Sequence, residues 1–130
     1  FGGGQSGCEA ALELVYQGKH PTVVEYAVDL IATPMVPLPN ASFLREALVF
    51  HGVPIYLEST ISEIKDGSVV IKGKDGTVTE VEADNVVNAI GFVPTPVAKS
   101  GRNVHLVGDC VSIGNLRTVI WRAWDVCMKI

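Results

Sequence analysis

The stretch that decides the fold opens the chain and reads Phe1-Gly2-Gly3-Gly4-Gln5-Ser6-Gly7-Cys8-Glu9. A glycine-rich turn of this kind needs a strand leading into it, and Phe1 is the one residue that stands before the turn. Apolar residues then recur at helical spacing over residues 5–17, at Cys8, Ala11, Leu12 and Val15. Gly18 follows where a helix ends in the left-handed conformation. The sequence therefore predicts a truncated first strand, a glycine turn and a helix.

The elements that follow alternate between strand and helix. Residues 22–26 form a short β-branched run, and the next dozen residues contain Pro34, Pro37 and Pro39, which we expect to exclude helix and central strand. A helix capped by Asn40 or Ser42 is predicted to run to about His51, and residues 53–57 form the third strand. Strand, helix, strand, helix, strand is half of a doubly wound, Rossmann-like fold with a parallel sheet.

The pattern changes after the third strand. Three short strands are predicted at 61–65, 68–72 and 77–82, with Asp66-Gly67 and Asp75-Gly76 between them, and Asp-Gly suits the positive φ of a tight hairpin turn. We expect a buried strand at 86–90, a further strand at 104–107 and an amphipathic helix that closes the chain at 116–130. The predicted class is α/β: a Rossmann-like parallel half-sheet with an inserted three-stranded antiparallel meander.

Composition excludes several functions. The 130 residues carry a net charge of −4 and no basic run, so nucleic acid is not an expected partner. No membrane span is expected, because the longest apolar segment, 30–39, is short and holds three prolines. The three cysteines contain no C-x-x-C pair, which argues against a disulfide framework, a thiol redox motif and a metal site. We expect them to be reduced and buried in a cytoplasmic protein.

Gly2-x-Gly4-x-x-Gly7 matches the fingerprint of dinucleotide-binding folds. The first glycine permits the tight turn, the second lets the backbone approach a pyrophosphate, and the third lets the helix pack on the sheet. Gln5 and Ser6 lie between them, at a helix start whose free N–H groups bind phosphates.

Glu25 stands eighteen residues after Gly7, at the end of the second strand. A carboxylate there accepts both ribose hydroxyls of the adenosine and repels a 2′-phosphate, so we favour NADH over NADPH. Tyr26 follows it as a further candidate for cofactor binding.

Three other candidates have two interpretations each. Glu9, placed on the first helical turn, either complements the helix dipole or lies beside the nicotinamide. Gly91 is either a simple turn or, as we favour, a point of close approach to a cofactor. Asp109 either caps the loop that follows it or binds a ribose or ribityl hydroxyl. No nucleophile–base pair emerges, so no catalytic residue is assigned.

These segments together resemble one family over nearly the whole chain. The glycine turn, Val-Val-Glu, the meander, Ala-Ile-Gly-Phe-Val-Pro and Val-Gly-Asp-Cys are similar to the C-terminal reductase half of the 2-enoate reductase and 2,4-dienoyl-CoA reductase family. These are NADH:flavin oxidoreductases related to old yellow enzyme, and residues 114–121 look closest to the 2-enoate reductase branch.

The resemblance implies an electron path and places residues on it. It implies NADH binding at Gly2, Gly4, Gly7 and Glu25, a nicotinamide beside Gly91, and an FAD ribityl chain at Asp109. Electrons would pass from NADH to FAD, then through a [4Fe–4S] cluster to FMN and an activated C=C bond. The FMN and cluster ligands would lie outside this chain.

The resemblance also divides the chain. Residues 1–95 are expected to be an NADH-binding domain lacking most of its first strand, and 96–130 the closing strand and helix of the FAD domain. The segment between Gly91 and Gly108 is shorter than the family leads us to expect. The partner would be the remainder of the parent flavoprotein, and the fragment alone is expected to be inactive. The sheet edge left by a missing strand also suggests self-association.

There are three alternatives to this function, and the first two stay open. The chain could serve another flavin disulfide-reductase-like enzyme, of the NADH oxidase or ferredoxin reductase type. It could be a non-enzymatic NADH-sensing module. An ordinary nicotinamide dehydrogenase is disfavoured, because such a chain usually continues strand–helix–strand without a meander.

Overall fold

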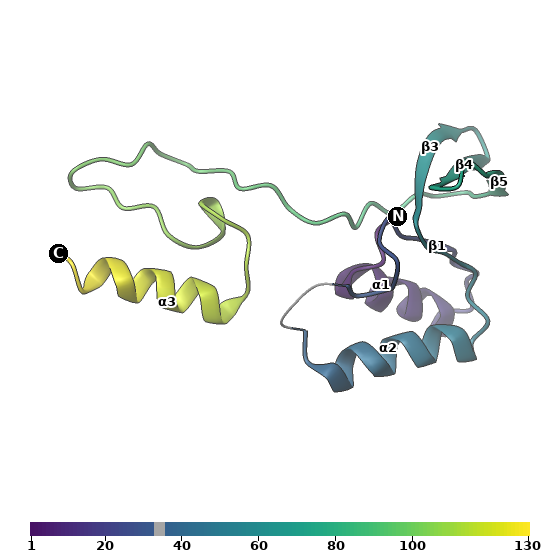
Figure 1. Cartoon of the computed structure of the whole chain (residues 1–130), viewed down its shortest axis with the longest axis horizontal. Helices are drawn as coiled ribbons and strands as arrows, with labels where there is room; N and C mark the ends of the chain where they lie inside the picture. Colours follow the sequence, from purple (N-terminus) through teal and green to yellow (C-terminus); the bar gives the residue numbers. More distant parts are fainter. Residues whose placement is uncertain (33–35) are drawn as a thin grey trace. The chain divides into compact units, whose positions relative to one another are not determined.

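The computed structural model describes residues 1–32 and 36–130, which form two compact units, Phe1–Gly91 and Phe92–Ile130 (Figure 1). The proline at position 34, expected to interrupt regular structure, lies outside the described residues.

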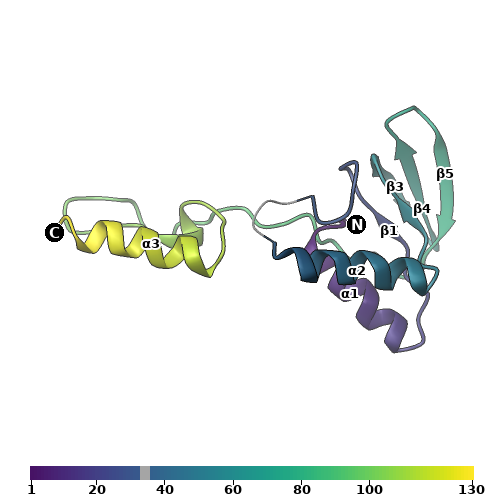
Figure 2. The ribbon, with the colours of Figure 1, turned by 60° about the horizontal axis from the view of Figure 1, so that its bottom comes forward.

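The first unit begins with the alternating part of the fold. Its elements are α1 (Gln5–Tyr16), β1 (Val23–Val24), α2 (Leu38–Phe50) and β2 (Ile55–Tyr56). Strands β1 and β2 pair in parallel, and the two helices lie on one side of β1 (Figure 2). Their apolar faces form a core with β1, which consists of Cys8, Ala11, Leu12, Val23, Leu30, Ile31, Ala41, Leu44, Leu48 and Val53.

Helix α2 begins earlier than the sequence predicts. It starts at Leu38 with Pro37 as its N-cap and Pro39 in its first turn, so the predicted start at Asn40 or Ser42 is wrong. The N–H groups of the first turn have no partner inside a helix, so a proline there removes no hydrogen bond.

The meander is present as expected and lies on the other side of β1 (Figure 2). Strands β3 (Ser59–Lys65), β4 (Ser68–Gly73) and β5 (Val78–Glu82) form an antiparallel sheet in that order. Both turns place a glycine at positive φ, +79° at Gly67 and +90° at Gly76, which confirms the two Asp-Gly turns. A second small core joins this sheet to β1 through Val24, Val69 and Ile71. The α/β class with a parallel half-sheet and an inserted meander is confirmed.

The strand predicted at 86–90 is not formed. The Phe1 ammonium group donates to the Val87 carbonyl at 2.6 Å, and the Ala89 N–H donates to the Phe1 carbonyl at 2.7 Å. These two bonds are the pattern of parallel pairing, but they form a single bridge and not a ladder. Val87 and Ile90 are more than half exposed, so the expected burial is wrong too.

The second unit has little regular structure before its last helix. The strand predicted at 104–107 is absent: Val104 forms only an isolated bridge with Gly101. A short 3₁₀ turn, η1 (Gly108–Cys110), precedes α3 (Leu116–Cys127), which ends three residues before the predicted end. Asn115 and Thr118 form a capping box at its start.

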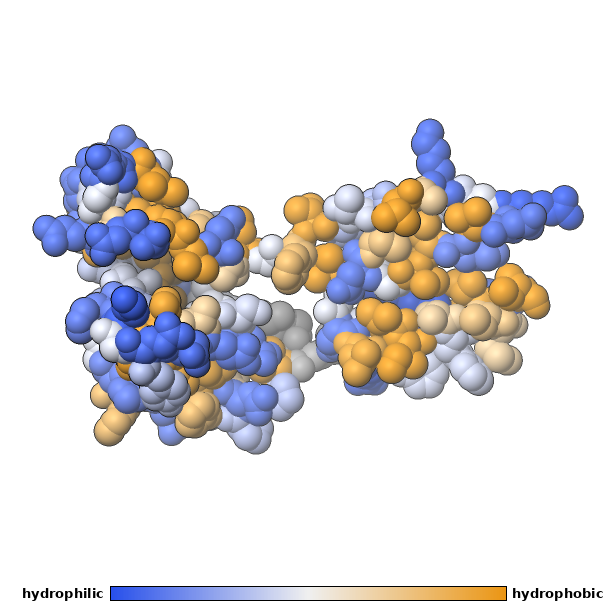
Figure 3. Space-filling view, turned by 180° about the vertical axis from the view of Figure 1, so that it is seen from behind, coloured by the Kyte–Doolittle hydropathy of each residue, from blue (hydrophilic) through white to orange (hydrophobic). Residues whose placement is uncertain are grey.

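The apolar stripe of α3 lies at the surface. None of its residues is buried, and Leu116, Ile120, Trp121 and Trp124 are all more than half exposed. Figure 3 shows apolar side chains gathered on the exposed face of this unit. No helix in the described part of the chain is long and apolar enough to cross a membrane.

The core of the first unit should be sensitive to truncation of Leu48, whose side chain is fully buried on α2. We expect Leu48→Ala to lower the free energy of unfolding by about 2–5 kcal/mol, because it removes buried apolar surface and leaves a cavity. Val49→Ala, one residue along and 68% exposed, should change it by no more than about 0.5 kcal/mol. Urea denaturation measures both, and equal losses would contradict this core.

Candidate functional site

The three glycines of the dinucleotide fingerprint, Gly2, Gly4 and Gly7, differ in what surrounds them. Gly2 has φ +103°, and a Cβ there would lie 2.4 Å from the Ala89 carbonyl oxygen. A Cβ on Gly7 would lie 1.9 Å from the carbonyl oxygen of Gly2. Around Gly4, in contrast, no atom lies within 4 Å of such a Cβ. The first and third glycines are therefore required by packing, while the second borders open space.

Helix α1 starts directly from this turn. Gly4 is its N-cap, in an extended conformation and with no side-chain cap, and its carbonyl accepts the Cys8 N–H at 3.0 Å. The N–H groups of Gln5, Ser6 and Gly7 precede that first helical bond and belong to the unpaired donors of a helix start. With the positive end of the helix dipole they favour an anion.

The Glu25 carboxylate lies beside the same turn. Its two oxygens accept the N–H groups of Gly3 and Ala27, at 2.5 and 2.6 Å. The backbone of Glu25 is fixed as well, because its N–H donates to Tyr56 and its carbonyl accepts from Ser59. Each carboxylate oxygen can accept a second bond, so this group retains capacity for two hydroxyls.

The carbonyl of Gly3 is held from the interior. It accepts the Ile31 N–H at 2.7 Å and the Cys8 thiol at 3.3 Å. Burial, with the Glu25 carboxylate as the next cause, raises the pKa of Cys8 to about 11. The thiol therefore stays protonated at neutral pH and acts as a donor to this carbonyl.

Two other sequence candidates lie near this turn. Glu9 was expected on the first helical turn, but α1 starts at Gln5, so the first turn ends at Cys8 and this expectation is wrong. The Glu9 carboxylate is exposed and accepts a bond from the Gln5 side chain at 2.8 Å. Tyr26 follows Glu25 with its side chain mostly in solvent.

Gly91 and Asp109 lie apart in the chain from the opening turn. Gly91, at φ +97°, is the last residue of the first unit. Asp109 belongs to η1 of the second unit, where its carboxylate accepts the Gly114 N–H at 3.1 Å. That bond is the loop-capping contact that the sequence offered as one of two interpretations. The structure thus brings together Gly2, Gly4, Gln5, Ser6, Gly7 and Glu25.

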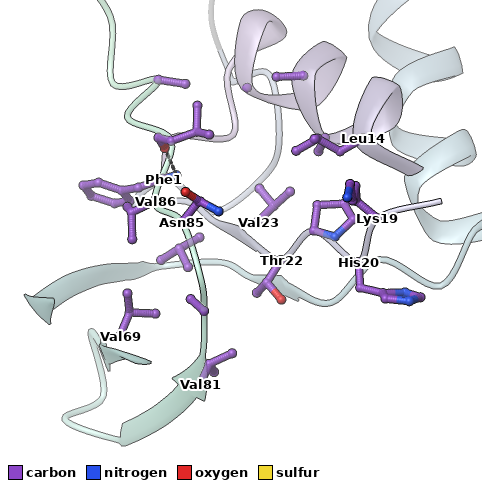
Figure 4. Close-up of a pocket in the computed structure, with 18 of the residues that line it drawn as sticks. Phe1, Leu14, Lys19, His20, Thr22, Val23, Val69, Val81, Asn85 and Val86 are labelled. Carbon is purple, nitrogen blue, oxygen red and sulfur yellow. Dashed lines mark hydrogen bonds between the residues drawn. The ribbon is translucent and has the colours of Figure 1, made fainter. Parts of the chain in front are cut away.

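A cavity of about 670 Å³ lies in the first unit and borders the turn at Phe1, Gly2 and Gly7 (Figure 4). Its wall is largely apolar and includes Leu14, Val23, Val69, Val81 and Val86. Gly4 and Glu25 are not among the residues that line it. Across residues 1–32 and 36–130 no cluster of three or more metal-binding side chains occurs.

Sequence reasoning missed two residues behind the turn. Ile31 has φ +51°, a conformation that a β-branched residue rarely adopts, and Arg45 of α2 donates twice to the neighbouring Leu30 carbonyl. Nothing in the sequence around Ile31 marks a positive φ, since glycine and asparagine are its usual signals. From the sequence, Arg45 is indistinguishable from any charged residue on the exposed face of a helix.

The comparison with protein families agrees with this geometry. The family described as pyridine nucleotide-disulphide oxidoreductase matches residues 1–118. The chain belongs to this family. The wider part of the resemblance, to oxidoreductases that use a pyridine nucleotide, is therefore confirmed.

Individual relatives of this oxidoreductase chain are much longer than it is. Cinnamate reductase of Clostridium sporogenes is 32% identical over 137 residues, which cover 100% of this chain and 20% of that protein. NADH oxidase of Thermoanaerobacter brockii is 28% identical, with 100% and 21% covered. The solved structure of a 2-naphthoyl-CoA reductase superposes with a TM-score of 0.80 at 27% identity, covering 99% of this chain and 20% of the other. The chain thus spans about a fifth of the length of each.

The glycines of the turn give a matched pair of variants. Gly7→Ala should destabilise the fold, because its Cβ would overlap the Gly2 carbonyl and force α1 away from the turn. We expect a loss of about 1–3 kcal/mol in the free energy of unfolding, measured with urea. Gly4→Ala, at φ −69° and with open space around the new methyl group, should lose clearly less stability, because only the weaker N-cap preference of alanine acts there. If the two variants were equally stable, the close approach of Gly7 would be wrong.

The raised pKa of Cys8 predicts a pH dependence of stability. Its thiol ionises near pH 11 in the folded chain but near 9.0, the ordinary value, once unfolded. Above pH 9 the unfolded chain therefore releases a proton that the folded chain keeps, so stability falls as the pH rises through this window. Urea unfolding at about pH 8 and about pH 10.5 should show a larger loss for the wild type than for Cys8→Ala. Equal losses would contradict the assignment.

Proposed function

We propose that the chain is the NADH-binding part of a flavin-dependent oxidoreductase and positions NADH for hydride transfer to FAD. The observation that carries this proposal is the Glu25 carboxylate, held by the Gly3 N–H beside a glycine turn that opens a helix. This arrangement supplies an acceptor for ribose hydroxyls next to a set of donors for a diphosphate.

In this proposal each part of the turn has its own task. The diphosphate approaches Gly4, where the backbone borders open space, and accepts from the N–H groups of Gln5 and Ser6. Glu25 accepts the adenosine ribose hydroxyls, and its negative charge disfavours the 2′-phosphate of NADPH. Tyr26 flanks this ribose.

Glu9 and Gly91 are proposed to lie toward the nicotinamide half, and Asp109 toward the ribityl chain of FAD. When bound, NADH supplies the hydride and FAD accepts it, so the residues of this chain need only bind and orient. We assign no acid, base or nucleophile to them.

We further propose that the parent protein reduces an enoate-type C=C bond through FMN and a [4Fe–4S] cluster held outside this chain. Support comes from cinnamate reductase, which matches the whole chain and whose named substrate is itself a 2-enoate. In this proposal residues 96–130 close the FAD domain, and the remainder of the parent flavoprotein is the partner.

A second candidate is an NADH oxidase, favoured by the match of the whole chain to the Thermoanaerobacter brockii protein. The parent protein separates the two. It should show flavin absorbance that bleaches with NADH, and it should then oxidise NADH with an enoate under anaerobic conditions. NADH oxidation that requires oxygen and ignores enoates would favour the oxidase.

Glu25 gives the direct test of the nucleotide site. Glu25→Gln keeps an oxygen for the Gly3 N–H but removes the charge, so we expect the preference for NADH over NADPH to fall about tenfold, or about 1.4 kcal/mol. Fluorescence titration with both nucleotides measures this ratio. Glu13→Gln, an exposed carboxylate on α1, is the matched control and should leave the ratio unchanged. If the wild type binds no NADH, or if Glu25→Gln keeps the wild-type ratio, the assignment is wrong.

A further inference from the structure

The peptide between Gly3 and Gly4 has a fixed orientation in this structure. Its carbonyl points into the core, where the Ile31 N–H and the Cys8 thiol donate to it. In a trans peptide the carbonyl and the following N–H point in opposite directions. The Gly4 N–H therefore points away from those two donors. The space beside Gly4 is open as well, since a Cβ there would meet no atom within 4 Å.

This orientation needs support from outside the turn. Glycine on both sides of the peptide permits backbone angles that other residues avoid, so the flip between the two orientations is sterically easy. The flipped peptide would present its carbonyl oxygen to an approaching phosphate and repel it. Affinity for a diphosphate thus depends on what holds the Gly3 carbonyl inward.

The supporting residue Ile31 is itself strained. At φ +51° a β-branched residue is strained and persists only where its surroundings fix it. Ile31 is 4% exposed and Leu30 is 3% exposed. The Leu30 side chain reaches within 2.6 Å of the place that a Cβ on Gly3 would occupy. The segment 29–31 therefore packs directly behind the glycine turn.

Arg45 holds this segment from helix α2. Its Nε and Nη2 both donate to the Leu30 carbonyl, at 3.0 and 2.5 Å, and Nη2 lies 3.0 Å from an Asp29 carboxylate oxygen. The ion pair is partly exposed and contributes little. The forked pair of bonds to the carbonyl is the stronger constraint, and a lysine cannot reproduce it.

We propose that Arg45 is a positioning residue for the nucleotide-binding turn. By fixing the Leu30 carbonyl it keeps Ile31 bonded to Gly3, and so keeps the Gly4 N–H directed at the diphosphate of the nucleotide. The inference rests on the proposed function, because it assumes that this turn binds NADH. Arg45 lies on α2 behind the turn and is not among the residues proposed to contact the nucleotide.

The test compares ligands with and without phosphates. Arg45→Gln should weaken NADH and ADP by the same factor, about tenfold if the competent orientation falls to about a tenth of the population. Adenosine, which has no phosphate, should bind Arg45→Gln and wild type alike. A general loss of folded structure would weaken all three ligands equally and would overturn the proposal. Fluorescence titration for NADH and competition for the other two supply the constants.

Two further variants separate geometry from charge. Arg45→Lys keeps the cation but not the fork, and it should lose NADH affinity in the same direction as Arg45→Gln. Wild-type affinity in Arg45→Lys would make the charge decisive and overturn the proposal. Asp29→Asn removes the ion pair but leaves the bonds to Leu30, and it should bind NADH like the wild type.

The outcomes also separate this inference from the proposed function. If the wild-type chain binds no NADH, the proposed function fails first. If the wild type binds NADH and Arg45→Gln binds it equally well, the function stands and the role of Arg45 is wrong.

Discussion

The contact between Gly7 and the carbonyl of Gly2 is the constraint on which the rest of the first unit depends. A helix can start this close to a strand only if its third residue has no side chain, and a Cβ on Gly7 would lie 1.9 Å from that oxygen. Helix α1 therefore starts directly after Gly4, and this places Cys8, Ala11 and Leu12 in the core. The same short path leaves its first N–H groups facing away from that core.

A chain of hydrogen bonds surrounds this contact and joins distant elements. The Glu25 carboxylate, just after β1, accepts the Gly3 N–H, and the Ile31 N–H donates to the Gly3 carbonyl. Arg45 then links Leu30 to α2. Both sides of one glycine are thus fixed by residues that lie more than twenty positions away in the sequence, so the turn adopts its shape only when the whole unit is folded.

Local patterns were sufficient for much of this fold. Helix α1 follows from apolar spacing, and the meander follows from its two Asp-Gly turns, because both signals act within a few residues. The glycine fingerprint likewise identified the turn and the helix start. The strand expected at 86–90 failed for a different reason: a strand exists only through its neighbour, and Phe1 alone pairs with this segment.

Sequence patterns do not predict the positive φ of Ile31, because it results from packing in the folded core. They do not predict the proposed role of Arg45 either, because its partner is a backbone carbonyl that is distant in the sequence. The cysteines show the same limit. Cys8 is buried because α1 packs on β1, whereas Cys127 lies on the uncovered α3 and is exposed.

Because Gly7 brings α1 so close to the turn, the stability of the core also depends on whether an anion is bound at the turn. Helix α1 is one continuous helix of twelve residues, with the unpaired N–H groups of its first turn at one end and core side chains along its inner face. An anion held by those N–H groups binds the folded chain and not the unfolded one, so its binding free energy adds to the stability of α1 packing. Opening of the core and release of the ligand then become a single thermodynamic event.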